Sequence, residues 1–377
     1  MKNRTFDVVI VGGGIIGTSI AYHLAQMGCD DVVLLERDDL TSGTTWHAAG
    51  LMVTYGSLSE TATEIRKYSR QLYASLEAET GLSTGLNQCG FIELANSADR
   101  LEEYRRVSAF NRYCGVDVQE ISAREVQDLF PIASVDDVLA GFYVEDDGRV
   151  NPVDVTMSLA KGARMMGVNI ITGVTATGVT RSGNTVTGVT TEQGSIACEF
   201  VVNCAGMWAR DFAADAGVTL PLHACEHFYI VTEAVPELGQ LPVLRVPDEC
   251  AYYKEDAGKI LLGAFEPVSK PWATGINGQG GIPDDFCFDQ LPEDFDHFEP
   301  ILEQAMNRFP ALMETGIHTF FNGLESFTPD DAYPLGLAPE MDNVWVAAGF
   351  NSIGIQSAGG AGMALSQWMD AGEKPFD

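Results

Sequence analysis

The chain has 377 residues, of which 46% are hydrophobic and 20% charged, a composition typical of a globular protein large enough for two domains. Its formal charge of −31 at pH 7 is spread along the sequence, which makes nucleic acid and anionic membranes poor partners. Neither a long apolar run nor a targeting signal occurs, so we expect a cytoplasmic protein without a membrane span. The eight cysteines form no Cys-x-x-Cys pair, and their spacing predicts neither a metal site nor a disulfide framework.

The first motif is an apolar strand over residues 8–11 that runs into Gly12-x-Gly14-x-x-Gly17 and an amphipathic helix. Gly12 allows the tight turn, Gly14 lets the backbone approach a pyrophosphate, and Gly17 lets the helix pack closely on the strand. The start of the helix favours phosphate because its N–H groups are free and its dipole is positive there. The predicted contacts of a dinucleotide are Gly12, Gly14, Ile15, Ile16 and Gly17.

A second strand over residues 31–35 ends in Glu36 and Arg37. Glu36 stands about 20 residues after Gly17, where an acidic side chain meets a ribose hydroxyl in this kind of fold. A carboxylate would repel a 2′-phosphate, which argues against NADP. The pattern by itself does not distinguish NAD from FAD.

The segment Thr41–Leu51, with the letters TSGTTWHAAGL, makes that distinction. It resembles the FAD-dependent sarcosine and dimethylglycine dehydrogenases, within the broader group of glycine and D-amino-acid oxidases. The resemblance implies that FAD is bonded covalently to His47, and a neutral imidazole is a suitable nucleophile for such a bond. The flavin contacts implied here are Thr44, Thr45, Trp46, His47 and Leu51.

In the middle of the chain, periodicity predicts helices over residues 60–79 and 98–113 and strands over 90–94 and 141–144. Asn151 and Pro152 predict the start of another helix, with an inner stripe of Met157, Ala160, Ala163 and Met166. A strand near residues 168–174 should then rejoin the cofactor sheet. The resemblance places the backbone of Val174 against the adenine, although a valine here is equally well explained as a sheet residue.

The second half begins with a predicted hairpin of residues 186–191 and 196–202. Residues 202–209 and 325–330 also match motifs of the family. Between them, residues 221–320 are rich in strands and indicate a mostly antiparallel region above the flavin. A strand over 344–348 then leads into a helix start at 349–355, whose dipole would stabilise negative charge on the flavin pyrimidine. The residues implied there are Ser352, Ile353, Gly354 and Ile355.

These elements predict an α/β (α+β) protein, with a Rossmann-like FAD-binding domain and an interleaved, mostly antiparallel β substrate domain. We expect the FAD-binding domain to comprise residues 1–85, 150–215 and 325–377. The substrate domain would comprise residues 86–149 and 216–324.

The resemblance implies oxidative N-demethylation of an N-methyl amino acid such as sarcosine or dimethylglycine. Hydride passes from the N-methyl carbon to the flavin, and water releases formaldehyde. His227 and Tyr252 match a histidine and a tyrosine on the family's substrate side, and each is equally well explained by packing within the sheet. The carboxylate partner is unassigned, since Arg245 and Lys254 near Tyr252 are also readily explained as surface cations. An anionic substrate would require a local positive patch to offset the acidic surface.

Several alternatives stay open at this stage. The electron acceptor is either oxygen or an electron-transfer flavoprotein. Long family members continue into a folate-binding domain where this sequence ends, so that part is a separate protein, absent, or outside the sequence given. The chain would otherwise be an NAD-dependent dehydrogenase, a flavin-carrying subunit without its own active centre, or an oxidase of another secondary or tertiary amino acid.

Overall fold

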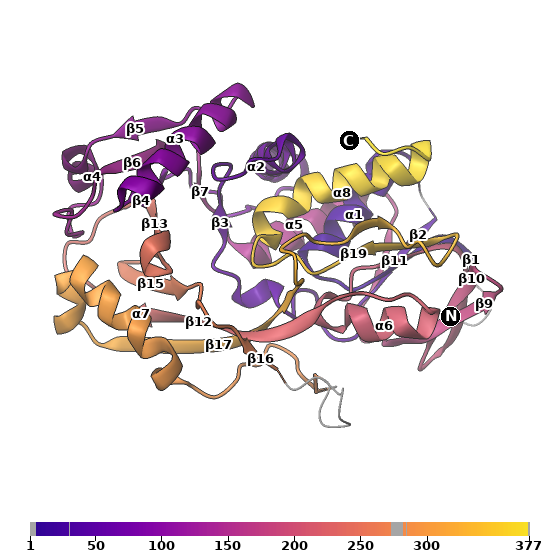
Figure 1. Cartoon of the computed structure of the whole chain (residues 1–377). Coiled ribbons are helices and arrows are strands. Elements are labelled where there is room, and N and C mark those ends of the chain that lie inside the picture. Colours follow the sequence, from indigo (N-terminus) through magenta and orange to yellow (C-terminus); the bar gives the residue numbers. More distant parts are fainter. Residues whose placement is uncertain (1–4, 30, 273–281, 284, 376–377) are drawn as a thin grey trace.

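The computed structural model describes residues 5–29, 31–272, 282–283 and 285–375. Two large sheets organise this part of the chain, and each lies in its own lobe (Figure 1). A small antiparallel pair of β3 (Leu51–Met52) and β7 (Gly148–Arg149) lies beside them. The mixed α/β class predicted from the sequence is confirmed. No helix among the described residues is both long and apolar enough to cross a bilayer.

The first sheet contains eight of the described strands, with β18-β19-β11-β1-β2-β8 as its main order. The pairs from β19 to β8 are parallel, whereas β18 and the hairpin of β9 and β10 add antiparallel edges. The strands are β1 (Thr5–Val11), β2 (Val32–Leu35), β8 (Asn169–Ile171), β9 (Ala176–Ser182), β10 (Thr185–Thr191), β11 (Gly194–Asn203), β18 (Leu335–Leu337) and β19 (Val344–Ala347).

Both faces of this sheet are covered, which explains the continuous apolar run of β1. Val8 and Ile10 pack in a core shared with the helices of one face, and Val9 and Val11 pack with α6 and the β9–β10 hairpin on the other. The helices are α1 (Ile15–Gln26), α2 (Glu60–Thr80), α5 (Pro152–Met165), α6 (Ala209–Ala216) and α8 (Gly354–Ala371). Figure 1 shows α1, α5 and α8 on one side of the sheet and α6 on the other.

The helix α5 begins where the sequence predicts, because the Asn151 side chain accepts hydrogen bonds from the N–H groups of Val153 and Asp154. The predicted inner stripe is wrong in part. Met157 is 38% exposed, and the buried face instead contains Val155, Leu159, Ala160 and Ala163. The small side chains Ala160 and Ala163 allow α5 to pack close to α1, and Val155 and Leu159 complete the core face.

The second sheet contains nine of the described strands, in the main order β16-β12-β15-β14-β13-β4-β6-β5 with β17 beside β12. All its pairs are antiparallel except that of β13 with β4. The strands are β4 (Phe91–Ala95), β5 (Gln119–Ile121), β6 (Ala140–Val144), β12 (His223–Thr232), β13 (Val243–Val246), β14 (Ala251–Asp256), β15 (Lys259–Ala264), β16 (Lys270–Pro271) and β17 (Ile317–Phe327).

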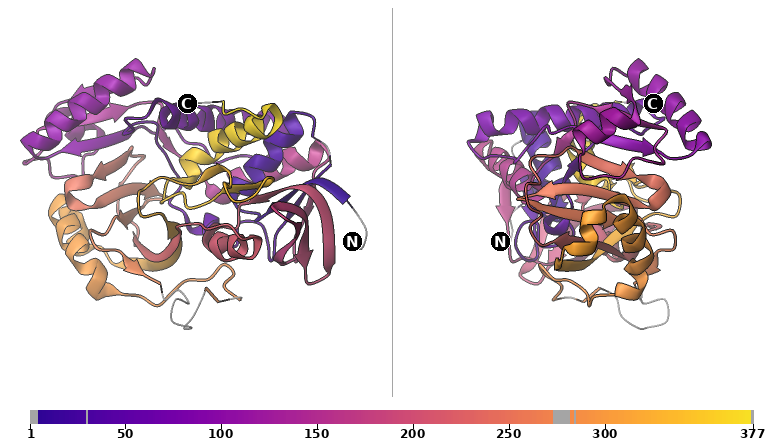
Figure 2. Two further views of the ribbon diagram at one scale, coloured as in Figure 1. Left: turned by 45° about the vertical axis from the view of Figure 1, so that its right-hand side comes forward. Right: turned by 90° about the vertical axis from the view of Figure 1, so that its left-hand side faces the viewer.

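The two faces of the second sheet have different roles. One face packs Phe228, Ile230 and Tyr253 against α7 (Phe295–Arg308) and its surroundings. The right-hand view of Figure 2 shows α7, in orange, on the outer side of the strands. Strand alternation turns the neighbouring residues His227 and Tyr252 to the opposite face. That face meets the segment around residues 44–51. The helices α3 (Ala98–Tyr113) and α4 (Ala123–Leu129) cover the far end of this sheet.

Candidate active site

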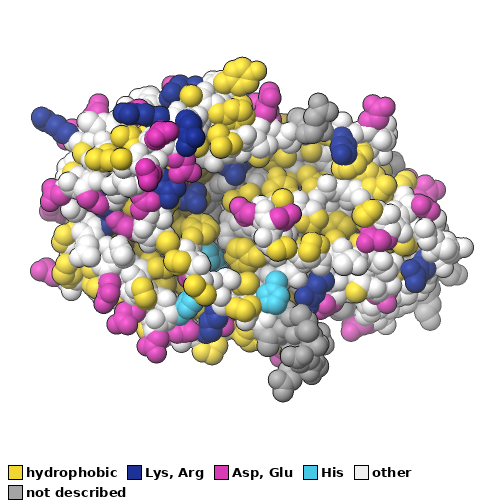
Figure 3. All heavy atoms as spheres, viewed as in Figure 1, with side chains coloured by type: hydrophobic (Ala, Val, Ile, Leu, Met, Phe, Trp, Pro, Cys, Tyr) yellow, Lys and Arg dark blue, Asp and Glu magenta, His cyan; other side chains and the backbone are white. Residues whose placement is uncertain are grey.

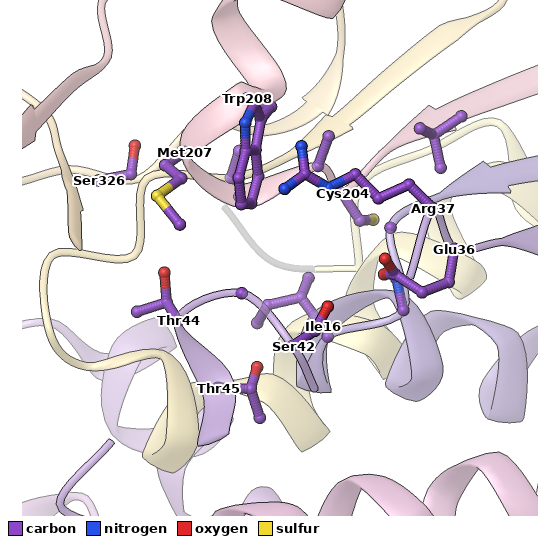
Figure 4. A pocket seen from close by; sticks show the side chains of 18 of the residues that line it. Ile16, Glu36, Arg37, Ser42, Thr44, Thr45, Cys204, Met207, Trp208 and Ser326 are labelled. Atoms are coloured by element: carbon purple, nitrogen blue, oxygen red, sulfur yellow. The ribbon is translucent and has the colours of Figure 1, made fainter. Parts of the chain in front are cut away.

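A cavity of about 900 Å³ lies at the carboxyl ends of the parallel strands of the first sheet. Its lining comes from many separate parts of the chain, close together only in the fold. These parts are residues 11–16, 35–38, 42–45, 48, 174–177, 192, 204–208, 211–212, 282–283, 325–326, 347–352 and 354–355. Figure 4 shows side chains from several of them directed toward the same space.

The start of α1 is built for close approach by a ligand. Gly12 has φ +111°, and a Cβ there would lie 2.3 Å from the Cys204 carbonyl oxygen. A Cβ on Gly17 would lie 2.0 Å from the Gly12 carbonyl oxygen, so both glycines are required by packing. Gly14 is the N-cap and has no side chain to cap the helix. The N–H of Ile15 donates to Thr45 Oγ1 at 3.2 Å, and the other N–H groups of the helix start are available to an anion.

Glu36 holds the turn between β1 and α1 and also lines the cavity. Its carboxylate accepts hydrogen bonds from the N–H groups of Gly13, at 2.6 Å, and Asp38, at 3.0 Å. The neighbouring Arg37 extends over the cavity, with its guanidinium carbon 3.8 Å from the ring centre of Trp208. Figure 4 shows these two side chains directed toward one another. They form one wall, and the buried Nε1 of Trp208 has no hydrogen-bond partner among the described residues.

His47 lies at the junction of the two lobes. Its ring is 4.8 Å from that of Phe321 and 5.5 Å from that of Trp46, and Gly323 leaves room for it, since a Cβ there would lie 3.0 Å from His47 Cε1. Burial, and next the charge of His227, lower the pKa of His47 to about 3. The imidazole is therefore neutral at pH 7, and its buried Nε2 has no hydrogen-bond partner among the described residues.

The second lobe places His227 and Tyr252 around one aromatic ring. The Phe265 ring centre is 5.5 Å from that of His227 and 5.6 Å from that of Tyr252. His227 is also the cross-strand partner of Gly323, the residue beside His47. The fold thus brings together the two histidines predicted from distant segments.

Glu266 is the hydrogen-bond partner of His227, with 3.3 Å between Oε2 and Nδ1. Burial lowers the pKa of His227, but the hydrogen bond to Glu266 and the charges of Glu325 and Glu266 outweigh it and raise that pKa. Burial, followed by the charge of Glu325, raises the pKa of Tyr252, so its phenol is protonated at pH 7. The pair of His227 and Tyr252 therefore offers one group that titrates and one that stays a donor.

The predicted residues fall into two sets. The following line the cavity: Gly12, Gly14, Ile15, Ile16, Glu36, Arg37, Thr44, Thr45, Val174, Ser352, Gly354 and Ile355. The others lie outside that lining: Gly17, Trp46, His47, Leu51, Ile353, His227 and Tyr252. Gly17 instead supports the turn, and His47 and Trp46 pack below Phe321.

Sequence reasoning missed several contributors. Glu266 follows strand β15 and carries no motif, so nothing in its local pattern marks it as the partner of His227. For Lys254, the structure excludes the surface-cation alternative, because the side chain is buried and its Nζ donates to the Ala49 carbonyl oxygen at 2.9 Å. Phe265 and the wall formed by Arg37 with Trp208 also depend on tertiary contacts, although Trp208 belongs to a segment that the sequence marked.

Residues 7–368 match the family of FAD dependent oxidoreductases. The chain belongs to this family. Over 98% of its length it is 40% identical to a 4-methylaminobutanoate oxidase (formaldehyde-forming) of Paenarthrobacter nicotinovorans, of which it covers 44%. It is 37% identical to the mitochondrial dimethylglycine dehydrogenase of Rattus norvegicus, with 100% of this chain and 44% of that protein covered.

A relative with a different description is the mitochondrial pyruvate dehydrogenase phosphatase regulatory subunit of Mus musculus, 39% identical over 96% of this chain and 41% of that protein. The chain thus spans less than half the length of these curated relatives. Among solved structures, L-proline dehydrogenase from P. horikoshii shares the fold, with a TM-score of 0.88, 22% identity and coverage of 99% of this chain and 95% of that one.

The cavity fits the cofactor that the family implies. The start of α1 at Gly14, where N–H groups beyond that of Ile15 are available, suits a pyrophosphate, and Glu36 lines the same cavity at the position where an acidic side chain meets a ribose. Trp208 Nε1 is an unpartnered buried polar atom on a residue that lines the cavity, and His47 Nε2 is another, on a residue between the lining residues Thr45 and Ala48. Membership of an FAD family decides against the NAD-dependent alternative.

Proposed function

We propose that this protein oxidises an N-methyl amino acid and removes the methyl group as formaldehyde, with FAD as the electron acceptor. The arrangement of His227, Tyr252 and Phe265 beside His47 is the observation that carries the proposal. The names of the relatives, a 4-methylaminobutanoate oxidase and a dimethylglycine dehydrogenase, support the substrate class. FAD supplies a hydride acceptor when it is bound.

The residues of the second lobe prepare the amine for that reaction. Loss of hydride from the methyl carbon requires a free nitrogen lone pair, and an alkylammonium in water keeps its proton at pH 7. His227 Nε2 is the candidate acceptor for that proton, because Nδ1 is engaged by Glu266. Tyr252 donates from its phenol and orients the substrate, and Phe265 excludes water from the same side.

Anaerobic reduction of the protein-bound flavin tests this proposal. Sarcosine, dimethylglycine and 4-methylaminobutanoate are mixed separately with the holoprotein, and the loss of flavin absorbance is followed. At least one should bleach the flavin with release of formaldehyde. His227→Ala should slow bleaching by about 100-fold or more, the contribution of a general base. An exposed histidine provides the control, since His318→Ala should react at the wild-type rate.

We also propose a covalent bond between His47 and the flavin. Its neutral ring and unpartnered Nε2 support this, as does the matching segment Thr41–Leu51. Acid precipitation of the wild type should give a yellow pellet, whereas His47→Ala should release all of its flavin to the supernatant. Recovery of the unmodified His47 peptide from fully loaded protein would contradict the bond. His23→Ala, at another buried histidine, should leave the pellet yellow.

A regulatory or flavin-carrying subunit is the second candidate function, because the relative described as a phosphatase regulatory subunit is 39% identical. Such a protein would bind FAD, but none of the three amino acids would bleach that flavin.

Oxygen consumption after bleaching separates the two possible electron acceptors. Re-oxidation of the flavin in air indicates an oxidase, and failure to re-oxidise indicates an electron-transfer protein. A folate-binding partner would trap the released one-carbon unit before it appears as formaldehyde.

A further inference from the structure

Arg245 extends from β13 into the space beside the proposed catalytic residues. It is the cross-strand neighbour of Tyr252, and its guanidinium carbon lies 5.2 Å from the ring centre of Phe265. The same ring is contacted by His227 and Tyr252. One aromatic side chain therefore joins the arginine to the candidate base and the candidate phenol.

The donors of Arg245 are free for a ligand. Its nearest acid is Glu93, at 3.8 Å between Nε and Oε1, which is longer than a hydrogen bond. That Glu93 oxygen already accepts a hydrogen bond of 2.9 Å from the Tyr104 hydroxyl. No described residue accepts a hydrogen bond from the Arg245 guanidinium, and the side chain is 39% exposed. A guanidinium group whose donors are unpaired is suited to bind an anion such as a carboxylate.

A second arginine, Arg66, lies on α2. Its Nη1 donates to the Tyr55 carbonyl oxygen at 3.2 Å, while its Nε is buried with no partner among the described residues. Gly56, the residue after Tyr55, borders Glu93, since a Cβ on Gly56 would lie 3.8 Å from Glu93 Oε2, and Glu93 is the cross-strand partner of Arg245. Burial lowers the pKa of Arg66, and the charge of Arg245 lowers it further against the opposing effects of Tyr333, Asp147 and Glu93.

The surroundings of Arg66 relate it to the cofactor cavity. Tyr333 raises the pKa of Arg66 through its charge. The Tyr333 ring also stacks on Phe350, at 4.3 Å between ring centres, and Phe350 lines that cavity. Asp147 does not neutralise the pair, because its carboxylate is already held by Arg70, at 3.0 Å, and by Thr54. Glu93 is the acid beside both arginines, so two guanidinium groups stand against one carboxylate at this end of the space, in a chain with a formal charge of −31. Figure 3 shows Lys and Arg side chains, with a His, in the hollow between the lobes.

We propose that Arg245 and Arg66 together bind the carboxylate of the substrate. The assignment rests on the proposed function, since it presumes an amino acid whose amine reaches His227. A carboxylate held by Arg245 leaves the amine on the side of Tyr252 and His227, where the proton is accepted. The pair supplies the local positive charge that an acidic surface makes necessary for an anionic group.

Binding of an unreactive carboxylate tests the assignment separately from the reaction. Methoxyacetate has the carboxylate of sarcosine but no amine, and its binding is followed by the change in flavin absorbance of the holoprotein. Arg245→Met and Arg66→Met should each raise its dissociation constant by about tenfold to a hundredfold, the effect of one charge-assisted hydrogen bond. Arg105→Met removes the same charge from an exposed ion pair with Glu120 and should leave the constant unchanged.

The reaction provides the second readout. In Arg245→Met, the sarcosine concentration that gives half the maximal reduction rate should rise by the same factor, while the limiting rate changes less. The methyl ester of sarcosine, which lacks the anion, should react similarly with variant and wild type. Arg66→Lys keeps the positive charge but loses the paired contact of a guanidinium, so it should weaken methoxyacetate binding, although less than Arg66→Met does.

The results separate this assignment from the proposed function. Wild-type affinity for methoxyacetate in both methionine variants, or no binding to the wild type, overturns the assignment. Weakened methoxyacetate binding in a protein that no N-methyl amino acid reduces would support the carboxylate site while refuting the proposed reaction.

Discussion

His227 shows how one neighbour sets the properties of a candidate base. Its ring is largely buried, which by itself favours the neutral form, yet Glu266 and Glu325 raise its pKa. A base must be neutral to accept a proton, so a raised pKa restricts the reaction to higher pH. The acidic neighbours therefore hold the ring in place and favour the protonated form once the proton has moved.

Glu266→Gln should shift the pH dependence of flavin reduction to lower pH. The variant loses the hydrogen bond and the charge that raise the pKa of His227, so the neutral ring persists at lower pH. The rise of the reduction rate with pH is measured for variant and wild type with the same substrate, whose own titration is then common to both. Glu120→Gln removes an exposed carboxylate and should not shift the profile. An unchanged profile in Glu266→Gln would exclude Glu266 from this role.

At the scale of elements, α8 determines how closely the helices pack on the first sheet. Glycines in α8 lie against α1 and α2, where a Cβ on Gly362 would meet Ser19 Oγ at 2.3 Å and one on Gly360 would meet the Ile65 carbonyl oxygen at 2.4 Å. The N–H of Gly360 also donates to Ser69 Oγ at 2.9 Å. This close crossing positions the start of α8, which lines the cofactor cavity.

Gly360→Ala should lower the free energy of unfolding by about 1–3 kcal/mol, because the added methyl overpacks a contact with the backbone of α2. This outweighs the higher helix propensity of alanine. Chemical denaturation of the flavin-loaded protein measures the change. Gln367→Ala, on the exposed side of the same helix, should stay within about 0.5 kcal/mol of wild type. A Gly360→Ala protein as stable as the control would refute the close crossing.

At the scale of the whole molecule, the cofactor cavity is lined by segments from residue 11 to residue 355. A ligand there contacts the turn of the first sheet, the Arg37 and Trp208 wall and the start of α8 at once. Its binding free energy therefore stabilises a large part of the fold, because the unfolded chain has no such site.

Thermal unfolding of His47→Ala protein tests this coupling, since its flavin is exchangeable under the proposal above. The unfolding midpoint should rise with FAD concentration, with about 2.7 kcal/mol of stabilisation at a concentration 100 times the dissociation constant. Riboflavin lacks the pyrophosphate and adenosine that Gly14 and Glu36 are placed to contact, so it should stabilise much less at the same concentration. Equal stabilisation by riboflavin would contradict the role given to the start of α1.

Local patterns in the sequence determined much of the first lobe. Strand β1, the glycine turn and α1 depend on contacts close in sequence, and Gly12 has the positive φ that the pattern requires. Asn151 caps α5 for the same reason. The division into two domains, and the roles of the site residues, stay predictions.

Only the tertiary structure decided which distant side chains meet. His47 lies beside Gly323, and Arg245 shares the Phe265 ring with His227, through strand pairings between segments remote in sequence. Glu266, Arg66 and Lys254 carry no pattern of their own, because charged residues are ordinary on a surface. The burial of Lys254, and the hydrogen bond of Glu266 to His227, result from the packing of the second sheet against the first lobe.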